Sequence, residues 1–91
     1  MDNNALKVNP SDNVAIAIKP IKKGDAIFIE GEKLFVAVQD IEPSHKIALL
    51  EIDTGATVIR YGEPIVRAVK DIHKGEWVHV HNTQPIPNIQ L

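Results

Sequence analysis

Hydrophobic and polar positions alternate along several short segments of the chain. Six segments are rich in β-branched and aliphatic residues, and several of them alternate with a period of two: residues 14–18, 26–31, 34–38, 57–62, 64–69 and 76–82. That period places successive side chains on opposite faces of an extended chain, which is typical of half-buried β-strands. The pattern therefore predicts an all-β fold, a compact domain of short strands with at most short helical turns.

One segment leaves two interpretations open. Residues 44–52, SHKIALLEI, could form a further strand or a short helix with Ser44 as its N-cap. No other segment has a convincing helical pattern of ten or more residues (about three turns), so a Rossmann-type fold is excluded.

A short pattern recurs in the middle of the chain, in residues 21–27, 52–58 and 72–78. Each copy has an apolar residue, two polar residues, a glycine, two variable residues and a β-branched aliphatic residue. We interpret the pattern as one turn used three times, in which glycine supplies a positive φ and the flanking aliphatic residues enter the core. The copies are unequally spaced, so they do not form a solenoid.

Composition divides the chain into three parts. Residues 1–13 are rich in Asn, Asp, Ser and Pro and predict a flexible N-terminal segment, residues 14–82 form the domain, and residues 83–91, TQPIPNIQL, predict an extended tail. The apolar residues of 85–91 follow the last strand, so we predict that this tail contacts a partner chain.

The charge and the missing residue types exclude several classes of function. The 91 residues carry a net charge of −2 and no cysteine, and the pI is about 6.0. A basic nucleic-acid footprint, a disulfide framework, a thiolate zinc site and a cysteine nucleophile are therefore excluded. No apolar stretch reaches the ~18 residues of a membrane span. We expect a cytoplasmic domain without nucleic-acid or membrane partners.

The segment 75–82, GEWVHVHN, carries the strongest candidate chemistry. On a strand, Trp77, His79 and His81 would share one face, and Val78 and Val80 would enter the core. Two imidazoles on one face can bind a metal or transfer protons, or they can simply belong to a solvated strand face.

A third imidazole is available from another turn. His45 and Lys46 follow a Pro-Ser pair that bends the chain at the surface. We expect His45 to approach His79 and His81 and to complete a site with them. His73 lies in the polar pair of a repeated turn, so we expect it to be exposed and exclude it from the site.

Several strings together resemble the N-terminal domain of the altronate/galactarate dehydratase family: D-N-V-A-I-A-I (12–18), H-K-I-A-L (45–49), Y-G-E-P-I (61–65) and G-E-W-V-H-V-H-N (75–82). The resemblance covers residues 9–82 and implies an SAF domain with the β-clip fold. The chain departs from the family pattern at Ser44 and Val66, where the family usually has glycine.

The resemblance also implies a function. The chain is similar to the small subunits of split altronate dehydratases, which remove water from an aldonic or aldaric acid with a separate large catalytic subunit and a divalent metal, iron(II) or manganese(II). The residues implied are His45, Lys46, His79 and His81 as catalytic groups, with the three histidines as metal ligands or acid/base groups. A sulfolactate sulfo-lyase small subunit and a non-catalytic carbohydrate-binding β-clip module stay open as alternatives, as does a homo-oligomer.

Overall fold

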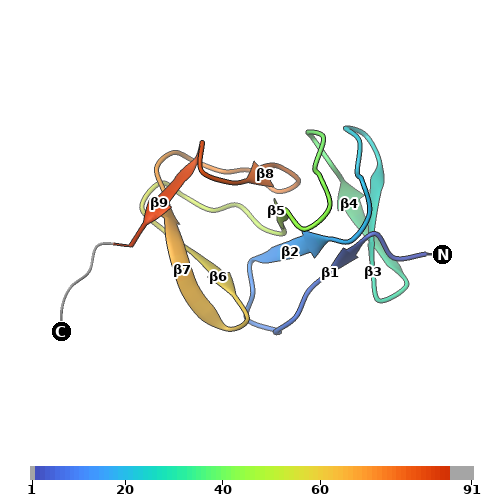
Figure 1. Cartoon of the computed structure of the whole chain (residues 1–91), viewed down its shortest axis with the longest axis horizontal. Helices are drawn as coiled ribbons and strands as arrows, with labels where there is room; N and C mark the ends of the chain where they lie inside the picture. Colours follow the sequence, from blue (N-terminus) through green and yellow to red (C-terminus); the bar gives the residue numbers. More distant parts are fainter. Residues whose placement is uncertain (1, 87–91) are drawn as a thin grey trace.

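The computed structural model describes residues 2–86, in which every regular element is a short β-strand (Figure 1). In chain order the strands are β1 (Ala5–Leu6), β2 (Val14–Ala17), β3 (Ala26–Ile29), β4 (Glu32–Val36), β5 (Lys46–Ala48), β6 (Thr57–Arg60), β7 (Glu63–Ala68), β8 (Trp77–Val78) and β9 (Thr83–Pro85). The all-β prediction is confirmed. The open alternative at 44–52 is resolved as strand β5, and residues 2–86 contain no helix that is long and apolar enough to cross a membrane.

The strands form three small antiparallel sheets. A four-stranded sheet, in the order β1-β2-β5-β8, lies in the middle of the molecule, with the β3–β4 hairpin at one end and the β6-β7-β9 sheet at the other (Figure 1). Both hairpins close through two residues with positive φ, Glu30-Gly31 and Tyr61-Gly62. Positive φ at both positions gives a tight turn whose twist matches that of the paired strands.

The N-terminal segment differs from the prediction of a flexible stretch. Strand β1 pairs with β2, and Ala5 is buried in the core. The Asn4 side chain accepts the N–H of Phe28 and donates to the carbonyl of Ala26. Asparagine was interpreted as a turn former, but here its side chain supplies the backbone hydrogen bonds that hold the segment against β3.

The predicted tail begins as a strand. Residues Thr83–Pro85 form β9, which pairs with β7. The remainder of the predicted partner contact, residues 87–91, lies outside the described residues.

The repeated turn occurs four times within residues 2–86, not three. In each copy the N–H of the central residue donates to the carbonyl of a buried alanine: Gly24 to Ala37, Ser44 to Ala17, Gly55 to Ala68 and Gly75 to Ala48. The three glycines have φ of 92°, 87° and 91°, and Ser44 has φ of 74°. The fourth copy, residues 41–47, is therefore the same turn with serine in place of glycine.

This fourth turn reveals an internal repeat. Turn 21–27 lies 31 residues before turn 52–58, and turn 41–47 lies 31 residues before turn 72–78. Ile21 bridges to Ile41 in the first half, and Ile52 bridges to Ile72 in the second. The three glycine-containing turns are unequally spaced along the chain because turn 41–47, which pairs with turn 21–27, has serine in place of glycine.

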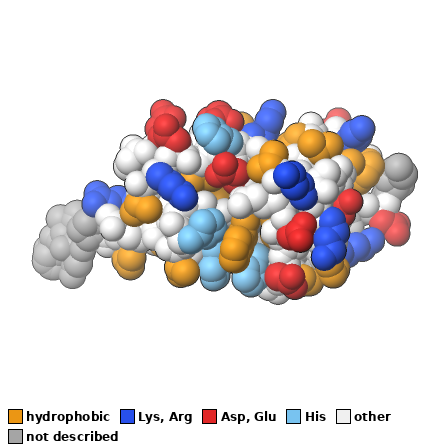
Figure 2. All heavy atoms as spheres, turned by 90° about the horizontal axis from the view of Figure 1, so that it is seen from above, with side chains coloured by type: hydrophobic (Ala, Val, Ile, Leu, Met, Phe, Trp, Pro, Cys, Tyr) orange, Lys and Arg blue, Asp and Glu red, His pale blue; other side chains and the backbone are white. Residues whose placement is uncertain are grey.

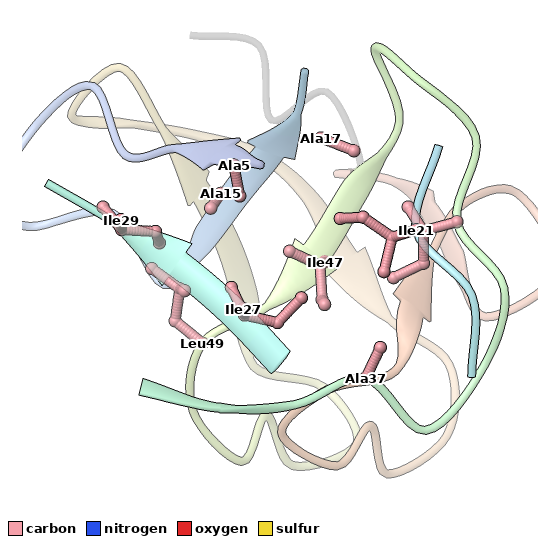
Figure 3. Close-up of a cluster of buried hydrophobic side chains, with 10 residues drawn as sticks. Ala5, Ala15, Ala17, Ile21, Ile27, Ile29, Ala37, Ile47 and Leu49 are labelled. Carbon is pink, nitrogen blue, oxygen red and sulfur yellow. The ribbon is translucent and has the colours of Figure 1, made fainter. Parts of the chain in front are cut away.

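The apolar residues of the turns supply much of two hydrophobic clusters. The first, in which the side chains converge between the sheets (Figure 3), consists of Ala5, Ala15, Ala17, Ile21, Ile27, Ile29, Ala37, Ile41, Ile47 and Leu49. The second consists of Val14, Ala48, Ile52, Val58, Ala68, Ile72 and Val78. Strands β2, β5 and β8 contribute to both clusters or pack against them, so the central sheet is a rigid base for the side chains at its edge.

Candidate active site

Two of the four turns bring His45 and His79 together. Strand β5 pairs with β8 so that Lys46 lies opposite Val78 and Ile47 opposite Trp77. The next position in this register places His45 opposite His79. Their rings stack with centroids 4.8 Å apart and planes inclined by 22°. The expectation that His45 approaches the C-terminal histidines holds for His79.

Trp77 lies at the centre of this group. Its ring centroid is 5.6 Å from that of His45, 5.1 Å from that of His79 and 4.7 Å from that of His81. Trp77 also packs against the first hydrophobic cluster, which anchors it. In Figure 2, pale blue histidine side chains gather beside a hydrophobic side chain on one face of the molecule. We call His45, Trp77, His79 and His81 the His–Trp cluster.

A hydrogen bond within the cluster orients one imidazole. The indole Nε1–H of Trp77 donates to Nδ1 of His45 over 3.0 Å. An indole nitrogen can only donate, so Nδ1 of His45 must be the acceptor. The neutral ring therefore carries its proton on Nε2, and His45 presents an N–H donor on the side away from Trp77.

The segment after Val78 differs from the predicted strand 76–82. Strand β8 ends at Val78, and Val80 is 78% exposed instead of buried. The cause is Asn82, which is 1% exposed. Its side chain accepts the N–H of His79 at 2.9 Å and donates to the carbonyl of Trp77 at 2.8 Å. These bonds close a turn over residues 79–82, so the strand alternation stops and both histidines are set by the turn.

Asn82 is thus a positioning residue that the sequence reasoning missed. It was treated only as the end of the W-V-H-V-H-N string. The only available signal was that string itself, since a buried asparagine that bonds backbone groups cannot be distinguished from an exposed turn residue by its type.

The electrostatic surroundings keep His79 neutral. Burial lowers the pKa of His79 from its ordinary value, and repulsion from the charge of Lys46 and from the protonated forms of its neighbours His45 and His81 lowers it further. Lys46 is half-buried beside the cluster, and its own pKa is lowered by burial and then by the charge of Arg60. A neutral imidazole can accept a proton, so His79 has the state that a general base requires.

The turn that carries His45 differs from the other three in its charge. In those three turns a carboxylate accepts the N–H of the residue before the glycine: Asp40 from Lys23, Asp71 from Thr54 and Glu51 from Lys74. In turn 41–47 that residue is Pro43, which has no N–H, and Pro20 stands where the acid would lie. The usual carboxylate is therefore replaced by proline next to His45.

His73 shows what such a carboxylate does. It is exposed, and its Nδ1 lies 2.6 Å from Oε1 of Glu51. The hydrogen bond to Glu51 and the charge of that carboxylate raise the pKa of His73. His73 lies outside the His–Trp cluster, as the sequence predicts.

The three imidazoles of the cluster do not fit the metal site that the sequence suggests. Among residues 2–86, no group of three or more His, Asp or Glu side chains is arranged to hold a metal ion. The lone pairs of an imidazole lie in the plane of its ring, and the rings of His45 and His79 stack face to face. Their nitrogens therefore point along nearly parallel planes instead of converging on one ion.

Comparison with known proteins identifies the family of this domain. The model of the altronate/galactarate dehydratase SAF domain matches residues 3–85. The chain belongs to this family. The resemblance inferred from the sequence strings is therefore confirmed, and it extends further toward both ends than residues 9–82.

Some individual relatives match most of the chain, and others match about half of it. Altronate dehydratase of Bacillus subtilis is 40% identical over 87 residues, which are 94% of this chain and 17% of that enzyme. Galactarate dehydratase (L-threo-forming) of Escherichia coli is 40% identical over 75 residues, 80% of this chain and 14% of that enzyme. The (2R)-sulfolactate sulfo-lyase subunit alpha of Paracoccus pantotrophus is 46% identical over 46 residues, 50% of this chain and 69% of that subunit. The chain thus spans about one sixth of the dehydratases that it matches.

Proposed function

We propose that this domain is the small SAF component of a sugar-acid dehydratase of the altronate dehydratase type. It works with the larger catalytic part that accounts for the rest of these enzymes, either as a separate subunit or within one chain. The observation that carries the proposal is the stacked pair of His45 and His79, of which one presents an N–H donor and the other is a neutral acceptor.

The two histidines match the two proton movements of a dehydration. A general base must remove the proton from the carbon next to the carboxylate, and an acid must assist departure of the hydroxyl from the neighbouring carbon. His79 takes the first role because it is held neutral. The neutral His45 assists the second by hydrogen-bonding its Nε2–H to the leaving hydroxyl, and the proton taken up by His79 departs with that hydroxide as water. Loss of water leaves an enol, which becomes a 2-keto-3-deoxy acid.

The other two predicted residues have supporting roles in this proposal. Lys46 adds positive charge beside His79, which favours its neutral form and attracts an anionic substrate. His81 is exposed and packs against Trp77, so it borders the cluster at the molecular surface. A divalent metal, iron(II) or manganese(II), would take its ligands from the larger part, because the three imidazoles do not converge.

The test is a domain replacement in altronate dehydratase of Bacillus subtilis. Residues 3–85 replace the matching segment of that enzyme, and formation of the keto acid from altronate is measured. We expect activity well above that of the enzyme without the segment. We expect His79→Gln to lower kcat by about 10²-fold or more, and His73→Gln to leave it unchanged.

Two outcomes would overturn the proposal. One is a chimera no more active than the enzyme without the segment, although the enzyme's own segment restores it. The other is equal activity of the His79→Gln and His73→Gln variants, which would leave this domain a non-catalytic carbohydrate-binding or structural module.

A second candidate is the small component of a sulfolactate sulfo-lyase. It is favoured by the similarity to subunit alpha of that enzyme, which is 69% covered by the match. The same proton abstraction would precede loss of sulfite instead of water. Release of sulfite from (2R)-sulfolactate by the corresponding chimera, without turnover of altronate, would select this alternative.

A further inference from the structure

Two cations from different sheets meet beside the His–Trp cluster. Lys46 lies opposite Val78 in the central sheet, so their side chains share one face. Val78 packs in the second hydrophobic cluster with Val58 of β6. Arg60 lies two residues beyond Val58 on the same strand, across an irregularity in the pairing of β6 with β7. Lys46 thus faces the second cluster, and Arg60 lies near enough that its charge adds to burial, the larger cause, in lowering the pKa of Lys46.

Neither cation has an acidic partner in residues 2–86. The salt bridges of this region join Lys19 to Asp2, Lys22 to Asp40 and His73 to Glu51. Two like charges brought together in a partly buried position repel each other. An anion bound between them would offset that repulsion, because an opposite charge nearby favours the charged form of each.

One donor of Arg60 is also left without an acceptor. Its Nε is buried and has no hydrogen-bond partner among the described residues. The guanidinium lies over the ring of Tyr61, 5.0 Å from its centroid, which holds the planar group in one orientation. A buried donor without an acceptor is costly, and native proteins rarely retain one without a ligand, ion or water.

We propose that Lys46 and Arg60 form a binding site for the carboxylate group of a small organic acid. A guanidinium edge matches the two oxygens of a carboxylate, and the ammonium group adds a point charge from the other side. Lys46 follows His45 directly and its charge acts on His79. A bound acid would therefore extend from the cations toward the imidazoles. That this acid is the substrate of a dehydratase rests on the proposed function, whereas carboxylate binding itself does not.

The site can be tested on the 91-residue chain with sodium gluconate as the probe. Backbone amide signals are followed by ¹⁵N–¹H NMR at constant ionic strength, and sorbitol serves as the uncharged polyol of similar shape. We expect saturable shifts at Lys46 and Arg60 with gluconate and none with sorbitol. Arg60→Met should weaken binding at least about tenfold, the effect of one lost charge-assisted hydrogen bond, and Arg60→Lys should weaken it less.

The matched control is Lys33→Met, since Lys33 is an exposed cation on β4 with no ion pair in the described part of the chain. It should bind gluconate like the parent chain. If Arg60→Met changes the overall spectrum, Lys46→Met takes its place with the same expected loss. Shifts that sodium chloride reproduces, or an equal loss in Lys33→Met, would overturn the proposal.

An acidic side chain of the larger part could occupy the same cations. In that case gluconate would not bind, and Arg60→Met would weaken association with the large part of altronate dehydratase, which overturns the small-acid site. If the chain binds gluconate but its chimera has no dehydratase activity, the carboxylate site stands and the proposed function is overturned. If the chimera is active but the parent chain does not bind gluconate, the proposed function stands and the carboxylate site is overturned.

Discussion

Ser44 lies where the other three turns have glycine, and its replacement by glycine should stabilise the domain. Its φ of 74° is in the left-handed region, where a residue with a side chain loses about 1–2 kcal/mol. Glycine removes this strain but gives the unfolded chain more freedom, which offsets about 0.4–1 kcal/mol. We therefore expect Ser44→Gly to raise the free energy of unfolding by about 0.5–1 kcal/mol.

The first turn offers a matched reverse exchange. Gly24 has φ of 92°, and a Cβ added there meets no atom within 4 Å. Gly24→Ser therefore tests the backbone alone and should lower the stability by a similar amount. Thermal unfolding followed by circular dichroism should show opposite shifts in Tm of about 2–8 °C for a domain of this size.

The reasoning would be refuted in two ways. A lower Tm for Ser44→Gly would mean that the serine side chain stabilises the turn more than its φ costs. Unchanged Tm values in both variants would mean that the conformation of this turn position does not limit stability.

Three further predictions concern the His–Trp cluster. In an NMR titration of the imidazole signals, His79 should titrate below and His73 above the ordinary histidine pKa, because burial and positive charge act on the first and a carboxylate on the second; the reverse order would contradict this. Asn82→Ala should lower the free energy of unfolding by about 1–3 kcal/mol in urea, because two backbone groups lose their partner, and a change under about 0.5 kcal/mol would refute its role. Trp77→Phe keeps an aromatic ring but removes the indole donor, so the ¹⁵N shift of His45 Nδ1 should move toward that of an imidazole nitrogen without a hydrogen bond, and an unchanged shift would exclude the bond.

The fold was predictable where local chemistry and tertiary packing agree. The repeated Ile-x-x-Gly-x-x-aliphatic pattern predicts turns with positive φ and buried ends, and Gly24, Gly55 and Gly75 have that geometry. Turn 41–47 was not predicted because the sequence pattern requires glycine at the central position. Ser44 adopts the same conformation only under constraint from its neighbours. The bond from its N–H to Ala17 is long-range and leaves no trace in the local sequence.

The candidate site was predictable in its residues but only partly in its geometry. Strand alternation grouped Trp77 with His79 and His81, and the three rings do lie together, but the turn over residues 79–82 and not a continued strand places the two histidines. It failed at Val80, because a side chain beyond the strand, Asn82, ends the strand early. Arg60 was missed because only the packing of the β6-β7-β9 sheet against the central sheet brings it near Lys46, and no spacing in the sequence encodes that packing.

The way the four turns close has a consequence for how this domain can change during evolution. Each turn is held by backbone hydrogen bonds to a buried alanine, which do not depend on the side chain of the residue after the central position; only in the first turn does that side chain, the carboxylate of Asp25, also accept a turn N–H, that of Lys22. That residue is Asp25, His45, Ala56 or Glu76 in the four copies. A reactive group can therefore be gained, lost or exchanged at any of these points while the scaffold persists. The fold thus separates the backbone groups that close its turns from side chains that can vary without opening them.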